Sequence, residues 1–108
     1  MLNHEETGIN LYCMAFSVED SDFEKLCLNL NEEQKKHLNS PSGLITVNLL
    51  SHWNKKKYRT LDFTNTTNEQ AIKKILIFYK HKTYRKNVGD HTFFEGISPY
   101  NGKICLGS

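Results

Sequence analysis

The chain has 108 residues and a formal net charge of +2, and this length suits one domain with one core, so we expect a single domain over residues 1–108. Hydrophobic residues make up 38% and charged residues 24%, a composition that excludes an intrinsically disordered chain. No apolar run approaches the roughly 20 residues of a membrane-spanning helix, so we expect no membrane partner.

The first predicted element is a strand, because residues 9–16 are β-prone and mostly apolar. Ser21 and Glu24 follow with the spacing of a capping box, which predicts the start of a helix. Four apolar side chains then recur at helical spacing and define one buried face: Phe23, Leu26, Cys27 and Leu30.

A second, shorter helix is predicted directly after the first. Asn31 and Gln34 repeat the capping spacing and begin a polar segment that runs to Leu38. Pro41 and Gly43 end it.

The middle of the chain predicts a β-hairpin. In residues 44–50 the odd-numbered positions are apolar, and they hold Ile45, Val47 and Leu49. This alternation indicates a strand, with a helix running through Trp53 as the alternative. The lysines at 55–57 are too charged for a core and predict the turn. Residues 58–63 predict the returning strand, with one parity formed by Arg59, Leu61 and Phe63.

The clearest helical pattern follows the polar turn at residues 65–68. Glu69 suits the positive end of a helix dipole, and five apolar residues then repeat at helical spacing: Ala71, Ile72, Ile75, Leu76 and Tyr79. Phe78 widens this face. Ile77 falls among the polar residues, where it is either an ordinary surface exception or part of an interface.

The C-terminal part predicts a turn at residues 88–90 and two strands, over 92–97 and 103–106, joined by the turn residues 98–102. The order of elements predicts an α+β fold. We expect a small antiparallel or mixed sheet of about 4–5 strands with two or three helices packed on one face.

Charge is strongly segregated along the chain. Residues 1–40 hold eight acidic and three basic side chains, a net −5, whereas residues 54–86 hold ten basic and two acidic ones, a net +8. The ten basic residues are the candidate binding site: Lys55, Lys56, Lys57, Arg59, Lys73, Lys74, Lys80, Lys82, Arg85 and Lys86. The alternative is that these side chains have no binding role and only keep a helix and a hairpin soluble, with the acidic half of the chain packed beside them.

We expect an interaction protein that is not an enzyme and that binds an acidic protein partner through its lysine-rich face. A second copy of the chain, bound through a sheet edge or an apolar patch, is the other expected partner. Single-stranded nucleic acid is the alternative partner, because aromatic residues are interleaved with the basic ones at 57–59 and 79–86. Two facts count against it. Lysine far outnumbers arginine, and no recognised nucleic-acid-binding motif is present.

A small enzyme is the third hypothesis. Asp90, His91 and Glu95 form the most enzyme-like local cluster, since a strand would place His91 and Glu95 on one face. The same residues also suit a polar strand start, so no catalytic residue is assigned. His52 precedes Trp53, which we expect to cap the core, with an interface anchor or a stacking platform as the alternative.

The cysteines predict neither a disulfide framework nor a structural zinc site. Cys13, Cys27 and Cys105 are odd in number, form no C-x-x-C pair and follow no secretory signal. Cys27 lies on a predicted core face, where a thiol is inert. We therefore expect no metal or other cofactor and a cytoplasmic location.

Abundant Lys, Asn and Ile with scarce Ala and Arg reflect A/T-rich codons, which suggests a small bacterial or phage protein or one from a mobile element.

Overall fold

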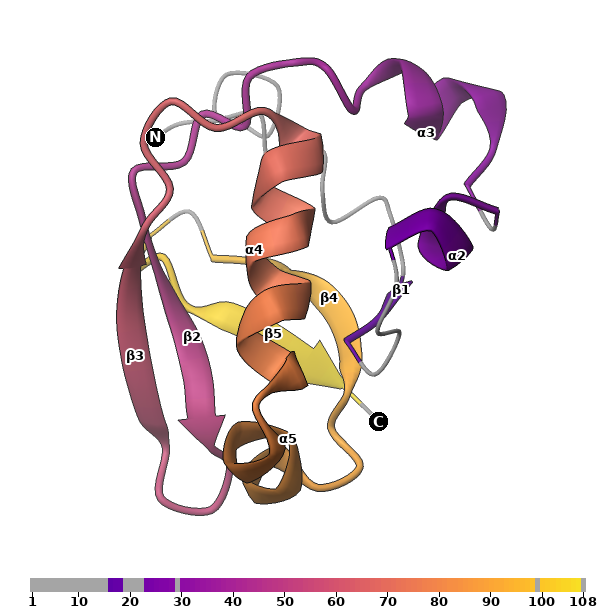
Figure 1. Ribbon diagram of the computed structural model, residues 1–108. Coiled ribbons are helices and arrows are strands. Elements are labelled where there is room, and N and C mark those ends of the chain that lie inside the picture. Colours follow the sequence, from indigo (N-terminus) through magenta and orange to yellow (C-terminus); the bar gives the residue numbers. More distant parts are fainter. Residues whose placement is uncertain (1–15, 19–22, 29, 99, 108) are drawn as a thin grey trace.

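A computed structural model describes residues 16–18, 23–28, 30–98 and 100–107 of the protein (Figure 1). Within these ranges the chain forms four helices and five strands. In chain order they are β1 (Phe16–Ser17), α2 (Phe23–Leu28), α3 (Glu32–Lys36), β2 (Thr46–His52), β3 (Lys57–Asp62), α4 (Asn68–Lys80), α5 (Lys82–Val88), β4 (Phe93–Ile97) and β5 (Ile104–Gly107).

The strands form two antiparallel sheets that lie next to each other. The first sheet has the order β1-β4-β5, and the second is the hairpin of β2 and β3. Asn48 of β2 connects them, because its backbone N–H donates to the Gly102 carbonyl at 2.7 Å and its side-chain amide donates to the Asn101 carbonyl at 2.8 Å. The predicted α+β class is confirmed, with the strands divided between two abutting sheets and α4 packed across them (Figure 1).

The predicted hairpin is confirmed, and the helical alternative through Trp53 is wrong. Val47 pairs with Leu61 and Leu49 pairs with Arg59 in an antiparallel ladder. Val47 and Leu49 are buried as expected, but Ile45 is not part of the core: it precedes β2 and is 70% exposed. Its backbone nevertheless continues the pairing, since the Ile45 carbonyl accepts the N–H of Phe63 at 2.7 Å.

The predicted helix after residues 65–68 is confirmed as α4. Thr67 and Gln70 form a capping box in which each side chain binds the other residue's backbone N–H. The five predicted stripe residues and Phe78 are buried, whereas Ile77 is 66% exposed. The helix therefore presents one wide apolar face to the sheets and a lysine-rich face to solvent.

One helix, α5, has no counterpart among the predicted elements, which place the basic tail of α4 and then a turn in this region. The chain bends at His81, where the backbone is extended, and α5 runs from Lys82 to a buried Val88. Tyr84 holds α5 against α4, because its ring stacks on Phe78 with 4.4 Å between centroids. Gly89 then ends α5 with a φ of 61°.

The N-terminal half is described in part. The predicted capping box of Asn31 and Gln34 is confirmed at the start of α3. Most of the predicted strand over residues 9–16 and the Ser21 cap lie outside the described residues. The described end of that strand is β1, in which Phe16 pairs with Phe94 of β4.

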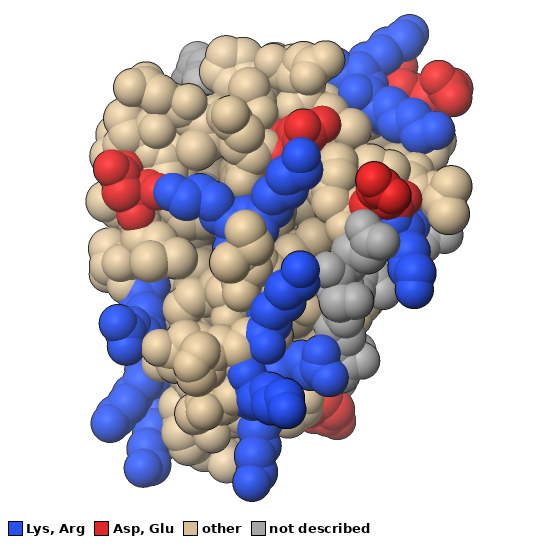
Figure 2. Space-filling model, in the orientation of Figure 1, with Lys and Arg blue, Asp and Glu red and all other residues tan. Residues whose placement is uncertain are grey.

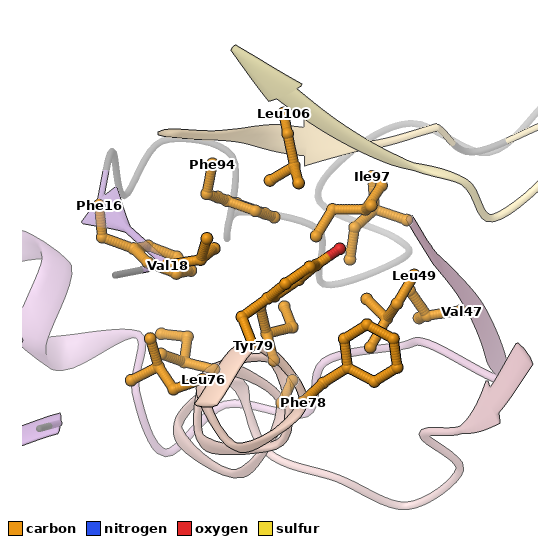
Figure 3. Packing of buried hydrophobic residues seen from close by; sticks show 14 of the residues in the cluster. Phe16, Val18, Val47, Leu49, Leu76, Phe78, Tyr79, Phe94, Ile97 and Leu106 are labelled. Atoms are coloured by element: carbon orange, nitrogen blue, oxygen red, sulfur yellow. The ribbon is translucent and has the colours of Figure 1, made fainter. Parts of the chain in front are cut away.

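The core lies between α4 and the two sheets (Figure 3). Tyr79 is its central polar anchor, since the ring is fully buried and its hydroxyl donates to the Leu50 carbonyl of β2 at 2.9 Å. Phe94 and Leu106 approach the same space from β4 and β5 (Figure 3). No helix among the described residues is long and apolar enough to cross a membrane.

Candidate binding site

Many of the Lys and Arg side chains in this view lie over the lower part of the molecule, where β3, the C-terminal end of α4 and α5 are found, and others lie higher, over the middle of α4 (Figure 2). Most acidic side chains visible in this view lie higher, some toward α2 and α3 and others over the upper part of α4 and beside β3. Two described acids of the first half lie close to basic side chains of α3 and its C-cap: Glu32 is 3.8 Å from Lys35 and Glu33 is 3.7 Å from His37. Glu32 and Glu33 therefore pair locally and not with the hairpin.

An open hollow of about 430 Å³ lies between the tip of the β2–β3 hairpin and α5. We call it the hairpin hollow. Its polar lining comes from two elements far apart in sequence: His52, Lys55, Lys57 and Arg59 of the hairpin, and Tyr84 and Asn87 of α5. Among the described residues the lining contains no Asp or Glu, and none of its three cations forms an ion pair.

The ladder register places Arg59 over α5. Arg59 pairs with Leu49, and paired residues point to the same side of a ladder, so Arg59 lies on the side that Leu49 buries beneath the helices. Its guanidinium carbon lies 5.9 Å from the centroid of the Tyr84 ring, within cation–π range. The planar donor group of Arg59 is thereby positioned beside the hollow.

His52 presents a defined donor to the same hollow. Its Nδ1 atom accepts the backbone N–H of Lys55 at 3.2 Å across the hairpin turn. A ring nitrogen that accepts a hydrogen bond carries no proton, so the neutral imidazole has its proton on Nε2. The turn that carries the lysines thus also selects the tautomer of His52.

Other candidate lysines are engaged elsewhere. Lys73 pairs with Glu69 at 3.2 Å, and Lys74 donates to the backbone carbonyl of Asp62. Lys73 and Lys80 flank a separate apolar hollow of about 180 Å³ between α2 and α4, beside the exposed Ile77. The ten predicted residues therefore belong to several local environments, and the hairpin hollow brings three of them together.

The aromatic rings interleaved with the basic residues pack against the protein itself. Tyr79 is fully buried. Lys103 lies over the Tyr58 ring at 4.8 Å, and Tyr84 stacks on Phe78 and contacts the His81 ring, the latter with 4.6 Å between centroids. The aromatic rings whose spacing among basic residues predicted base stacking therefore already pack against other side chains of the protein.

Trp53 and His91 form a stacked pair at the far side of α5. Their ring centroids are 3.7 Å apart with an interplanar angle of 15°, and the Lys56 ammonium lies 3.9 Å from the Trp53 ring centroid. The predicted position of Trp53 at the edge of the core is confirmed, because its half-buried ring packs against the core cluster. This stack, between residues 38 positions apart, has no signal in the sequence.

The third hypothesis needed His91 and Glu95 on one strand face. His91 precedes β4, stacks on Trp53 and lies 3.6 Å from the Asp90 carboxylate. Among the described residues no hydrogen bond or ion pair joins His91 to Glu95. His91 does line a second hollow of about 310 Å³, which shares Asn87 with the hairpin hollow.

No group of three or more metal-ligating side chains occurs within the described ranges. Cys27 is half-buried on α2, and its pKa is raised by burial first and by the nearby Glu69 carboxylate second. Cys105 is exposed. The raised pKa of Cys27 disfavours the thiolate that a Cys–His mechanism requires.

A scan against protein-family models, a search of curated proteins and a search of solved structures each found no match. The assignment of function therefore depends on the geometry of the molecule alone.

Proposed function

We propose that this chain is a non-enzymatic interaction protein that binds an acidic protein partner through its lysine-rich face, centred on the hairpin hollow. One observation carries the proposal. Lys55, Lys57 and Arg59 surround a hollow that has no carboxylate in its described lining. Uncompensated charges of one sign in a concave surface attract and orient an oppositely charged partner.

The aromatic environment favours an acidic protein over single-stranded nucleic acid. Single-strand binding without base readout depends on aromatic rings that offer a face to successive bases. The rings near the hollow instead contact Phe78, His81 and Lys103. The positive charge that nucleic-acid binding needs is therefore present. The aromatic rings that would stack on bases instead pack against other side chains of this protein.

The same reasoning favours a different chain over a second copy. An isologous dimer through this face would bring like charges together, which opposes association. A partner with clustered Asp and Glu meets the face with complementary charge.

Titration with two polyanions tests the proposal. Poly-L-glutamate represents an acidic protein surface and oligo(dT) represents a single strand, each measured by calorimetry at low and at high salt. The site variant is Lys55→Gln, Lys57→Gln and Arg59→Gln combined. The matched control removes the same charge from the other end of the molecule, at Lys25, Lys35 and Lys36.

We expect salt-sensitive binding of poly-L-glutamate by the wild type and the control, and at least tenfold weaker binding by the site variant, because three cations are removed from one hollow. Preference for oligo(dT) over poly-L-glutamate would replace the acidic partner with nucleic acid. Equal weakening in both variants, or no binding of either polymer, would overturn the proposal.

A further inference from the structure

We infer that the hairpin hollow is a recognition site for a phosphate monoester, carried as a phosphorylated side chain by the acidic partner. This inference rests on the proposed function and names the group that the hollow receives. It depends on the number, kind and arrangement of donors in the hollow.

The donors come from four types of group. Lys55 and Lys57 supply ammonium groups, Arg59 supplies a planar fork of N–H donors, and Asn87 supplies a side-chain amide. His52 adds a fourth type, because its Nδ1 atom is occupied by the Lys55 N–H and its proton is therefore on Nε2. A lining this rich in donors suits a ligand with many acceptor oxygens.

The charge of the lining distinguishes a phosphate from a carboxylate. A phosphate monoester carries about −1.5 to −2 charges near pH 7 and three acceptor oxygens, whereas a carboxylate carries one charge and two oxygens. Three cations without a carboxylate partner in the described lining match the larger charge. A single Asp or Glu would leave most of these donors without an ionic partner.

Arg59 is the residue expected to discriminate between the two. Its guanidinium binds phosphate in bidentate fashion, and its position beside the Tyr84 ring limits the orientations that it samples. Lysine at this position would keep the charge and lose the planar fork. Arg59→Lys therefore separates geometry from electrostatics.

The test uses three synthetic peptides that differ at one central position. Each has two glutamates on either side of a central phosphoserine, glutamate or serine. Calorimetry near neutral pH with the wild type should give at least tenfold tighter binding of the phosphoserine peptide than of the glutamate peptide, and weaker binding of the serine peptide. Arg59→Lys should lose most of the tenfold preference yet bind the glutamate peptide within about threefold of the wild type.

The outcomes separate this inference from the proposed function. Equal affinity for the phosphoserine and glutamate peptides, both lost in the site variant, would overturn the phosphate site and leave the acidic partner in place. A phosphoserine preference that is unchanged both in Arg59→Lys and in the site variant would show that the peptides bind outside the hairpin hollow, and would overturn this inference together with the hollow as the centre of the binding face. Binding of oligo(dT) with no binding of any peptide would overturn both.

Discussion

Tyr79→Phe removes the hydrogen bond that ties α4 to the hairpin while keeping the ring that fills the core. The Tyr79 side chain is fully buried, and its hydroxyl donates to the Leu50 carbonyl at 2.9 Å. A buried hydrogen bond contributes about 1 kcal/mol net, and a buried group left without its partner costs about 1–3 kcal/mol. We expect the variant to lose about 1–3 kcal/mol of unfolding free energy at neutral pH.

The same substitution has an opposite effect at alkaline pH. Burial raises the pKa of Tyr79, because it disfavours the charged phenolate. A tyrosine in an unfolded chain ionises at about pH 10. Above that pH the Tyr79 hydroxyl therefore releases its proton in the unfolded chain and keeps it in the folded protein. The wild-type unfolding free energy must then fall by up to about 1.4 kcal/mol per pH unit from this group. Phenylalanine lacks that proton, so the stability deficit of the variant should shrink as the pH rises above about 10.

Urea unfolding followed by the fluorescence of Trp53, the single tryptophan, measures both effects. Tyr100→Phe is the control, because Tyr100 is 79% exposed and such changes usually stay within about 0.5 kcal/mol. A Tyr79→Phe variant as stable as the wild type at neutral pH, or a deficit that grows with pH, would refute the reasoning.

Three further substitutions test the local structure. Thr67→Ala removes the side-chain acceptor of the α4 capping box and should cost about 1 kcal/mol in thermal unfolding; an unchanged melting temperature would contradict the role of the cap. Gly102→Ala should cost more than about 1 kcal/mol, because φ is 67° and the added Cβ would lie 2.9 Å from the Thr46 carbonyl oxygen; stability equal to wild type would count against this strain. The Thr64 hydroxyl first and its backbone N–H second hold the pKa of Asp62 below the usual value, so the stability from this group is present above the unfolded pKa and is lost as pH falls through the lower folded pKa. Thr64→Val should raise the Asp62 midpoint in an NMR titration, and an unmoved midpoint would exclude the hydroxyl as the main cause.

Elements with a local signal could be predicted from the sequence. The α4 stripe combines a 3.6-residue period with the capping spacing of Thr67 and Gln70, so propensity and packing agree. The hairpin has both strand alternation and a charged turn. Ile45 shows the limit of such patterns. It is two residues from Val47 and was expected on the same face, but it lies before β2 and its side chain is mostly exposed.

The α5 helix could not be predicted in the same way, since its stability comes from tertiary contacts. Its seven residues carry two large apolar positions, Tyr84 and Val88, one turn apart. A helix this short is marginal without packing, and the packing is supplied by Phe78 on another element. The i, i+4 spacing was the available signal, and the surrounding lysines obscured it.

The candidate site depends on the position of α5. The set of residues that line this site could therefore not be predicted from the sequence. The ten basic residues could be identified, but which of them meet depends on the ladder register that sets Arg59 opposite Leu49. The placement of Asn87 beside Lys55 and Lys57 depends on the bend at His81. Neither is a property of a short sequence window.

We expect the cation cluster of the hairpin hollow to contribute little to folding, which would favour a role in binding a ligand. Lys55, Lys57 and Arg59 are exposed, and none forms an ion pair with a described carboxylate. Like charges around one hollow repel, and relief of this repulsion should offset the loss of the contact between Arg59 and the Tyr84 ring, so the combined change of all three to Gln should leave the melting temperature unchanged or raise it slightly. The matched control at Lys25, Lys35 and Lys36 loses the Lys35–Glu32 pair and should show no such gain. Scanning calorimetry of both variants measures the difference. A marked loss of stability in the hairpin variant would mean that the cations serve the fold, and the case for a binding site would lose its physical basis.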